Sequence, residues 1–87
     1  MILARSPKTA WRIIEGEAVI LSLDTKAFRG LNPVGSRVWE LVDGQRSVED
    51  IVDVIVREFD VTPERAAEDV QAFVRELLDK ELLIRGG

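Results

Sequence analysis

The chain has 87 residues, which suits one domain over residues 1–87, near the lower size at which an apolar core is stable without disulfides or metals. Hydrophobic residues make up 46% of the chain and charged residues 32%, a composition typical of a folded domain and too apolar for a disordered one. The absence of Cys and His excludes disulfides, Cys/His zinc sites and His-assisted nucleophiles, and the net charge of −4 disfavours nucleic-acid binding.

The N-terminal part of the chain predicts three strands. Runs rich in apolar residues occupy Trp11–Ile14 and Ala18–Leu23, and a shorter run follows at Ala27–Leu31. Glu15-Gly16-Glu17 and Asp24-Thr25-Lys26 separate them, and these short connections suit hairpins, because a parallel crossover needs about a dozen residues. We therefore expect a three-stranded antiparallel meander.

From Asn32 onward the apolar residues recur at helical spacing. Asn32 is the expected N-cap of a first helix that Gly44 stops, Ser47 caps a second helix, and Thr62 caps a third helix that runs over Pro63–Lys80. The sequence thus predicts three helices. Their apolar stripes are Val34, Val38, Leu41 and Val42; then Val48, Ile51, Val52, Ile55 and Phe59; and then Ala66, Ala67, Val70, Phe73, Val74, Leu77 and Leu78.

The last residues leave two interpretations open. Leu82-Leu83-Ile84 forms either a short closing strand or an extended tail packed on the core, and Arg85-Gly86-Gly87 is expected to fray. The core then spans about residues 9–84. A three-stranded antiparallel sheet followed by three helices predicts an α+β fold of the winged helix-turn-helix type.

Charge argues against DNA binding by the third helix, the position of the recognition helix in such a fold. Its acidic residues outnumber its basic ones, so that carboxylates would lie beside phosphates. No nucleic-acid partner is therefore expected. The acidic residues are Glu64, Glu68, Asp69, Glu76 and Asp79, and the basic ones are Arg65, Arg75 and Lys80.

No part of the sequence indicates a membrane segment. No apolar run approaches the roughly 18 residues that span a bilayer, and the first residues, MILARSPKTA, lack the apolar stretch of a signal peptide. We therefore expect a cytoplasmic protein with no membrane partner.

The edge of the predicted sheet is the most informative surface. An edge strand has unpaired N–H and C=O groups, which proteins cover with another element, protect with charged side chains or pair with another chain. Lys26 and Arg29 are typical charged protectors, but Phe28 and Leu31 add apolar residues to the third strand. An extended peptide could add to this edge, and a solvated edge is the alternative. Trp11 and Trp39 either widen the buried faces of their elements or line a groove for a partner.

Four stretches of the sequence together form a specific pattern. They are the junction Leu31-Asn32-Pro33, the helix Val38-Trp39-Glu40-Leu41 followed by Asp43-Gly44, the helix start Ser47-Val48-Glu49-Asp50-Ile51, and Glu68-Asp69-Val70 with Phe73 and Leu77. With these stretches the chain resembles the PqqD-like proteins, also called recognition elements of ribosomally synthesised, post-translationally modified peptides. The resemblance covers about residues 11–84.

The resemblance implies a binding function without catalysis, cofactor or metal. Proteins of this family capture the leader segment of a precursor peptide and present the remainder to a modifying enzyme. The leader adds as a fourth strand beside the third strand, toward the third helix. Carried over, the implied main-chain contacts are Lys26, Ala27, Phe28, Arg29, Gly30 and Leu31, and the implied pocket residues are Phe28 and Leu31 with Ala66, Asp69, Val70 and Phe73.

Two pathways compete within this resemblance. The stretch LNPVGSRVW most resembles the corresponding stretch in the discrete leader-binding proteins of lasso-peptide clusters. The partners of those proteins are a leader peptidase and an ATP-dependent cyclase. The similar pyrroloquinoline quinone protein partners a radical S-adenosylmethionine enzyme. Asp69 either pairs with a basic or hydroxyl group of the leader or only caps the surface.

Two hypotheses come from other classes. One is an acidic winged-helix transcriptional regulator that binds protein instead of DNA. The other is a small hydrolase that uses a carboxylate pair, for which sixteen Asp and Glu residues are available. These acids are scattered along helical faces, which is typical of a solvated surface.

Overall fold

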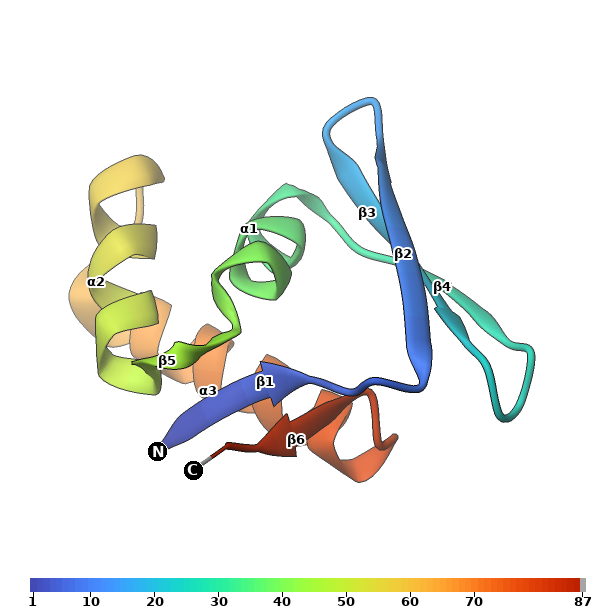
Figure 1. Ribbon diagram of the computed structural model, residues 1–87. Coiled ribbons are helices and arrows are strands. Elements are labelled where there is room, and N and C mark those ends of the chain that lie inside the picture. Colours follow the sequence, from blue (N-terminus) through green and yellow to red (C-terminus); the bar gives the residue numbers. More distant parts are fainter. Residues whose placement is uncertain (87) are drawn as a thin grey trace.

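Two small antiparallel sheets and three helices make up the structure (Figure 1). The computed structural model describes residues 1–86. The expected α+β architecture, a three-stranded antiparallel sheet followed by three helices, is confirmed. In chain order the elements are β1 (Ile2–Arg5), β2 (Thr9–Ile14), β3 (Glu17–Ser22), β4 (Phe28–Gly30), α1 (Pro33–Leu41), β5 (Asp43–Ser47), α2 (Val48–Glu58), α3 (Pro63–Asp79) and β6 (Leu83–Arg85).

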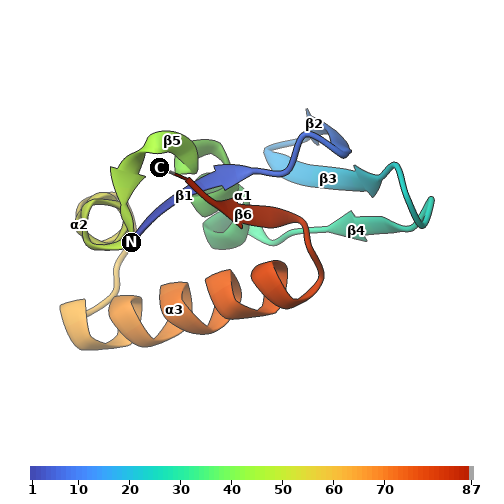
Figure 2. The same ribbon diagram turned by 60° about the horizontal axis from the view of Figure 1, so that its bottom comes forward.

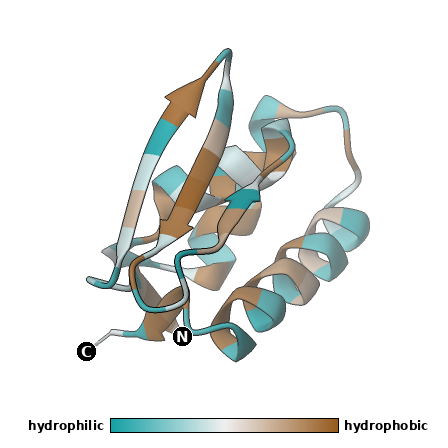
Figure 3. Ribbon diagram, turned by 90° about the vertical axis from the view of Figure 1, so that its right-hand side faces the viewer, coloured by the Kyte–Doolittle hydropathy of each residue, from teal (hydrophilic) through white to brown (hydrophobic). Residues whose placement is uncertain are grey.

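The predicted meander is the sheet with strand order β2-β3-β4. Trp11 lies opposite Ile20, and Ile20 lies opposite Arg29, so these three side chains share one face of the sheet. Ala18 and Ile20 on this face are buried. Figure 3 shows how hydrophobic residues are concentrated in β2 and β3. One face of the meander therefore closes the core.

A second sheet has the strand order β5-β1-β6. Its strand β6 is the closing strand that was one of the two interpretations of Leu82-Leu83-Ile84, whereas β1 and β5 were not predicted. Ile2 pairs with Ser47, and Leu3 pairs with Arg85. The expectation that the C-terminal residues fray is wrong for Arg85 and for Gly86, whose N–H donates to the Ile2 carbonyl at 2.9 Å. Backbone pairing with β1 holds them. Gly87 lies outside the described residues.

The predicted helix starts are confirmed. Asn32 Oδ1 accepts a hydrogen bond from the Gly35 N–H at 2.7 Å, Ser47 forms a capping box with Asp50, and the Thr62 hydroxyl accepts from the first turn of α3. The first helix ends at Leu41, before Gly44, because the chain turns there into β5. Gly44 instead has φ +85° within that strand, in the left-handed region that favours glycine.

The core lies between the meander, the second sheet and the three helices. Figure 2 shows α3 along one side of the molecule, beneath the strands. Trp39 is fully buried, so it widens the apolar face of α1. Trp11 packs edge-to-face against it, with ring centroids 6.2 Å apart, and Arg5 stacks on Trp11 at 4.9 Å. Leu3 on β1 is also fully buried, so the core reaches into residues to which the sequence analysis assigned no element.

Candidate functional site

The free edge of β4 is the first component of the site. The Ala27 carbonyl accepts a β3 amide at 3.0 Å, and the Leu31 N–H donates to a β3 carbonyl at 2.9 Å. In an antiparallel pair the backbone groups alternate in direction, so Arg29 also faces β3. Phe28 and Gly30 therefore turn their N–H and C=O groups toward the free edge.

This free edge is narrower than the predicted range. Lys26 has φ +62° and donates its N–H to the Ser22 carbonyl at 2.8 Å, so its backbone belongs to the turn. Leu31 is buried, and its N–H is used by β3. Only Phe28 and Gly30 within the predicted range offer free edge groups by this alternation, and peptide binding along the range stays a prediction.

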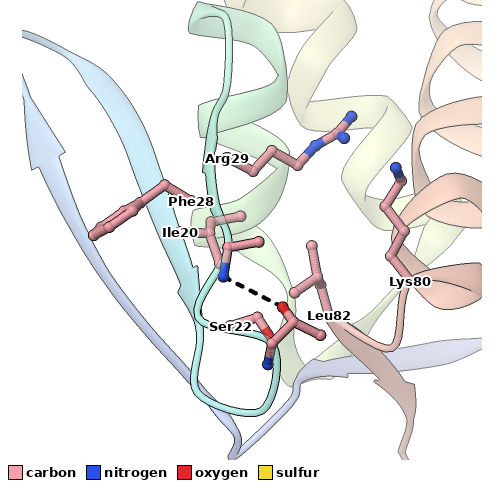
Figure 4. Close-up of a pocket in the computed structure, with 8 residues that line it drawn as sticks. Ile20, Ser22, Phe28, Arg29, Lys80 and Leu82 are labelled. Carbon is pink, nitrogen blue, oxygen red and sulfur yellow. Dashed lines mark hydrogen bonds between the residues drawn. The ribbon is translucent and has the colours of Figure 1, made fainter.

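A first pocket of about 370 Å³ lies between β4 and the C-terminal end of α3 (Figure 4). Ile20 and Leu82 are buried residues at its apolar base. Arg29 and Lys80 extend over it from the strand and from the helix. The lining residues are Ile20, Ser22, Thr25, Ala27, Phe28, Arg29, Lys80 and Leu82.

A second pocket of about 370 Å³ lies between α1 and the middle of α3. Gly35 makes this close approach possible, because a Cβ there would come within 3.3 Å of the Phe73 ring. Two carboxylates, Asp69 and Glu76, stand among its lining residues. The full set is Asn32, Val34, Gly35, Val38, Asp69, Val70, Ala72, Phe73 and Glu76.

An ion pair connects β4 to α3 between the two pockets. Arg29 Nη2 lies 2.6 Å from Glu76 Oε1, with both side chains partly buried. Arg29 lines the first pocket and Glu76 lines the second. We call the two pockets and this ion pair together the β4–α3 groove. Its position is beside the free edge of β4, where an added strand would lie.

A buried hydroxyl fixes the end of the groove. The Ala18 N–H donates to Ser36 Oγ at 2.7 Å, and Ser36 Oγ donates to the Leu31 carbonyl at 3.2 Å. Ser36 is 2% exposed. One side chain of α1 therefore joins β3 to the residue that follows β4, so the strand passes into the helix without a loose loop.

Only some of the predicted pocket residues line the two pockets of the β4–α3 groove. Asp69, Val70 and Phe73 lie together in the second pocket. Ala66 does not line either pocket, because it is 1% exposed within the core. The Phe28 ring, which is 73% exposed, points away from the groove, since β4 places it on the face opposite to Arg29 (Figure 4). Phe28 still borders the first pocket, whereas Leu31 lines neither pocket, and the expectation that both supply pocket side chains stays a prediction.

Asp69 has a partner on its own helix. Its Oδ2 lies 3.1 Å from Arg65 Nε in an exposed i,i+4 pair. Such an exposed pair is weak. The structure thus holds Asp69 at the rim of the second pocket with one oxygen engaged by its neighbour, and its expected role toward a leader stays a prediction.

The sequence analysis missed Glu76 and Lys80 as groove residues. Both continue the face of α3 that carries Asp69 and Phe73, at spacings of three and four residues. That periodicity was a usable signal. The contribution of Asn32 and Gly35 from α1 had no such signal, because it depends on how α1 packs against α3.

Two carboxylates outside the groove, Asp43 and Glu58, have lowered pKa values. The N–H groups of Gln45 and Arg46 donate to Asp43 Oδ1 at 3.0 and 3.1 Å, and these bonds lower the pKa of Asp43. The hydrogen bond from Arg37 lowers the pKa of Glu58. Within the described residues, no cluster of acids could hold a metal ion, and no helix has the length and apolar character needed to cross a membrane.

Comparison with known proteins identifies relatives of the chain. The family model of coenzyme PQQ synthesis protein D (PqqD) matches residues 17–83, which is most of the chain. A comparison with curated proteins finds no match.

Solved structures share the fold. TbiB1 in complex with the TbiA(beta) leader peptide is 38% identical, with a TM-score of 0.85 over 92% of this chain and 93% of that chain. Lasso peptide synthetase B1 complexed with the leader peptide is 17% identical, with a TM-score of 0.86 over 97% of this chain and 99% of that chain. A heterocyclase in complex with substrate and cofactor is 22% identical, with a TM-score of 0.66 over 99% of this chain and 11% of that chain.

The two kinds of comparison agree with each other and with the fold. The matched residues run from β3 to β6, and thus include β4, α3 and the whole β4–α3 groove. The likeness to TbiB1 extends over nearly the full length of both chains, whereas the two less identical structures bear on the fold alone. The chain belongs to the PqqD family.

Proposed function

We propose that this protein binds the leader segment of a ribosomally synthesised precursor peptide as a strand added to β4. The observation that carries the proposal is the free edge at Phe28 and Gly30, which borders the β4–α3 groove. Backbone hydrogen bonds along the edge would provide attachment that tolerates sequence, and the two pockets would receive alternate side chains of the guest. The leader complex of TbiB1, at 38% identity, supports this reading.

The bound leader is then presented to an enzyme that acts on the rest of the precursor. In a lasso-peptide pathway the partners are a leader peptidase and a cyclase, and the likeness to TbiB1 and lasso peptide synthetase B1 supports this pathway. The protein itself contributes binding without a catalytic step. We place it in the cytoplasm, where precursor peptides are synthesised.

A second candidate is a chaperone for a radical S-adenosylmethionine enzyme in pyrroloquinoline quinone biosynthesis. The match to the PqqD family model favours it. Both candidates use the same groove and differ in the precursor that is bound. Parallel titrations with a lasso-type leader and with a pyrroloquinoline quinone precursor peptide distinguish them by relative affinity.

The proposal is tested with the leader of a precursor peptide encoded beside the gene for this chain. A fluorescein-labelled leader is titrated with the protein, and its anisotropy is followed. We expect saturable binding with a Kd at or below about ten micromolar. No rise in anisotropy at about a hundred micromolar protein would rule out the function.

A further inference from the structure

The first pocket is cationic in a chain whose net charge is −4. Its charged lining residues are Arg29 and Lys80, and no carboxylate stands among its lining residues. Both side chains extend over the apolar base formed by Ile20 and Leu82 (Figure 4). The pocket thus combines two positive groups with a surface suited to a short hydrocarbon stem.

Both cations retain unused hydrogen-bonding capacity. Arg29 bonds Glu76 through Nη2, while its Nε is buried without a partner among the described residues. Lys80 forms no salt bridge within the described part of the chain. Arg29 therefore has donors beyond the one that Glu76 uses, and the Lys80 ammonium is available to an acceptor supplied by a ligand.

The second pocket has the opposite charge. Asp69 and Glu76 are carboxylates in its lining, and it has no cationic lining residue. The Arg29–Glu76 ion pair separates the two environments. A guest strand along β4 therefore meets a positive pocket at the Ala27 end of the strand and a negative rim at the Asn32 end.

We propose that the first pocket receives an acidic side chain of the bound leader, which Lys80 and the Arg29 guanidinium hold over the base formed by Ile20 and Leu82. This inference rests on the proposed function and specifies its substrate class. Alternate side chains of an added strand face the helix side, where Arg29 lies. Because the lining of the second pocket offers the same carboxylate two acids and no base, the acid also favours one direction of the leader in the groove.

A library selection tests the inference without a known leader. Random peptides long enough to add one strand, about ten residues, are displayed with linkers at both ends, so that no free terminal carboxylate competes. They are selected against the wild-type protein and against Lys80→Glu. We expect an Asp or Glu at one aligned position in the wild-type pool, and Lys or Arg at that position in the Lys80→Glu pool.

Affinities of individual peptides give the size of the effect. Lys80→Met should weaken an acid-bearing peptide about fivefold to tenfold and leave its Gln counterpart unchanged within about twofold. Arg75→Met is the matched control, because Arg75 is an exposed residue of α3 outside the groove and its loss changes the net charge equally. It should leave both affinities unchanged.

The outcomes distinguish failure of the acidic-side-chain proposal from failure of leader binding itself. Selected peptides that bind at micromolar concentration but share no acidic position, or keep the same acid with Lys80→Glu, overturn the acidic pocket and leave leader binding intact. Equal losses from Lys80→Met and Arg75→Met also overturn it, because they indicate a general charge effect. Failure to select any binder, together with failure of the anisotropy titration, overturns both proposals.

Discussion

At the scale of single residues, Ser36 is the side chain on which the strand-to-helix junction depends. Its hydroxyl is the acceptor for the fully buried Ala18 N–H and the donor to the Leu31 carbonyl. Ala18 and Leu31 both belong to the buried core, so their backbone groups depend on hydrogen bonds within the protein. The hydroxyl therefore supplies hydrogen bonds that β3 and Leu31 would otherwise lack.

We predict that Ser36→Ala lowers the free energy of unfolding by about 1–3 kcal/mol, because the Ala18 N–H is left buried without an acceptor. Urea denaturation measures the change. Ser22→Ala is the comparison, since the Ser22 hydroxyl accepts only an exposed hydrogen bond from Thr25, and should cost less than about 0.5 kcal/mol. Equal costs for the two variants would show that the Ser36 hydroxyl has no special structural role.

The lowered pKa of Asp43 predicts how the free energy of unfolding changes at acid pH. Hydrogen bonds from Gln45 and Arg46 lower the pKa of the Asp43 carboxyl in the folded state. Its contribution to the free energy of unfolding is therefore fully present above the pKa of the unfolded chain, and it is lost as the pH falls through the lower pKa of the folded state. The difference in unfolding free energy between the wild type and Asp43→Asn should be largest near neutral pH and shrink below about pH 4. A difference that stays constant down to about pH 2 would contradict this assignment.

At the scale of elements, the helices and the meander were readable from the sequence, whereas the strands β1 and β5 were not. The caps Asn32, Ser47 and Thr62 predict the helix starts because capping is local. The strand β5 reads Asp-Gly-Gln-Arg-Ser, without apolar alternation, and exists because its backbone pairs with the distant β1. Non-local pairing of this kind leaves no pattern in either segment.

Only the part of the groove that depends on a local sequence pattern was predictable. Asp69, Val70 and Phe73 follow from helical periodicity. The direction of the Phe28 ring does not follow, since β4 has three residues and a register shift of one residue reverses every side chain. The Arg29–Glu76 contact joins elements 47 residues apart and depends on how α3 packs beneath the meander.

The free edge of β4 predicts a difference between two substitutions of one residue. Gly30→Pro removes an edge N–H, and we expect it to weaken leader binding about threefold to tenfold. Gly30→Ala keeps the N–H, and its Cβ meets nothing within 4 Å, so affinity should change less than about twofold. Anisotropy titrations measure both, with circular dichroism to verify the fold. Equal affinities in folded variants would place the leader elsewhere.

At the scale of the whole molecule, the second sheet ties both chain ends to the core. Leu3 on β1 is fully buried, and β1 is the central strand between β5 and β6. A domain of this size has a net stability of about 5–10 kcal/mol. Loss of one such anchor therefore removes a large share of the total.

We predict that Leu3→Ala lowers the free energy of unfolding by about 2–5 kcal/mol, through lost burial and the cavity that remains. Ile2→Ala is the matched control on the same strand, because Ile2 is 38% exposed, and should cost less than about 1 kcal/mol. Chemical denaturation of the two variants decides the point. A small cost for both would mean that β1 is not an integral part of the fold.

The central claim is that a leader adds as a strand to β4, and amide hydrogen exchange at Phe28 and Gly30 tests it most directly. At a leader concentration about a hundred times Kd, we predict that exchange of these two edge amides slows by up to about a hundredfold, while the edge of β2 is unaffected. Saturated binding with unchanged exchange at Phe28 and Gly30, or with slowing on β2 instead, would contradict the claim.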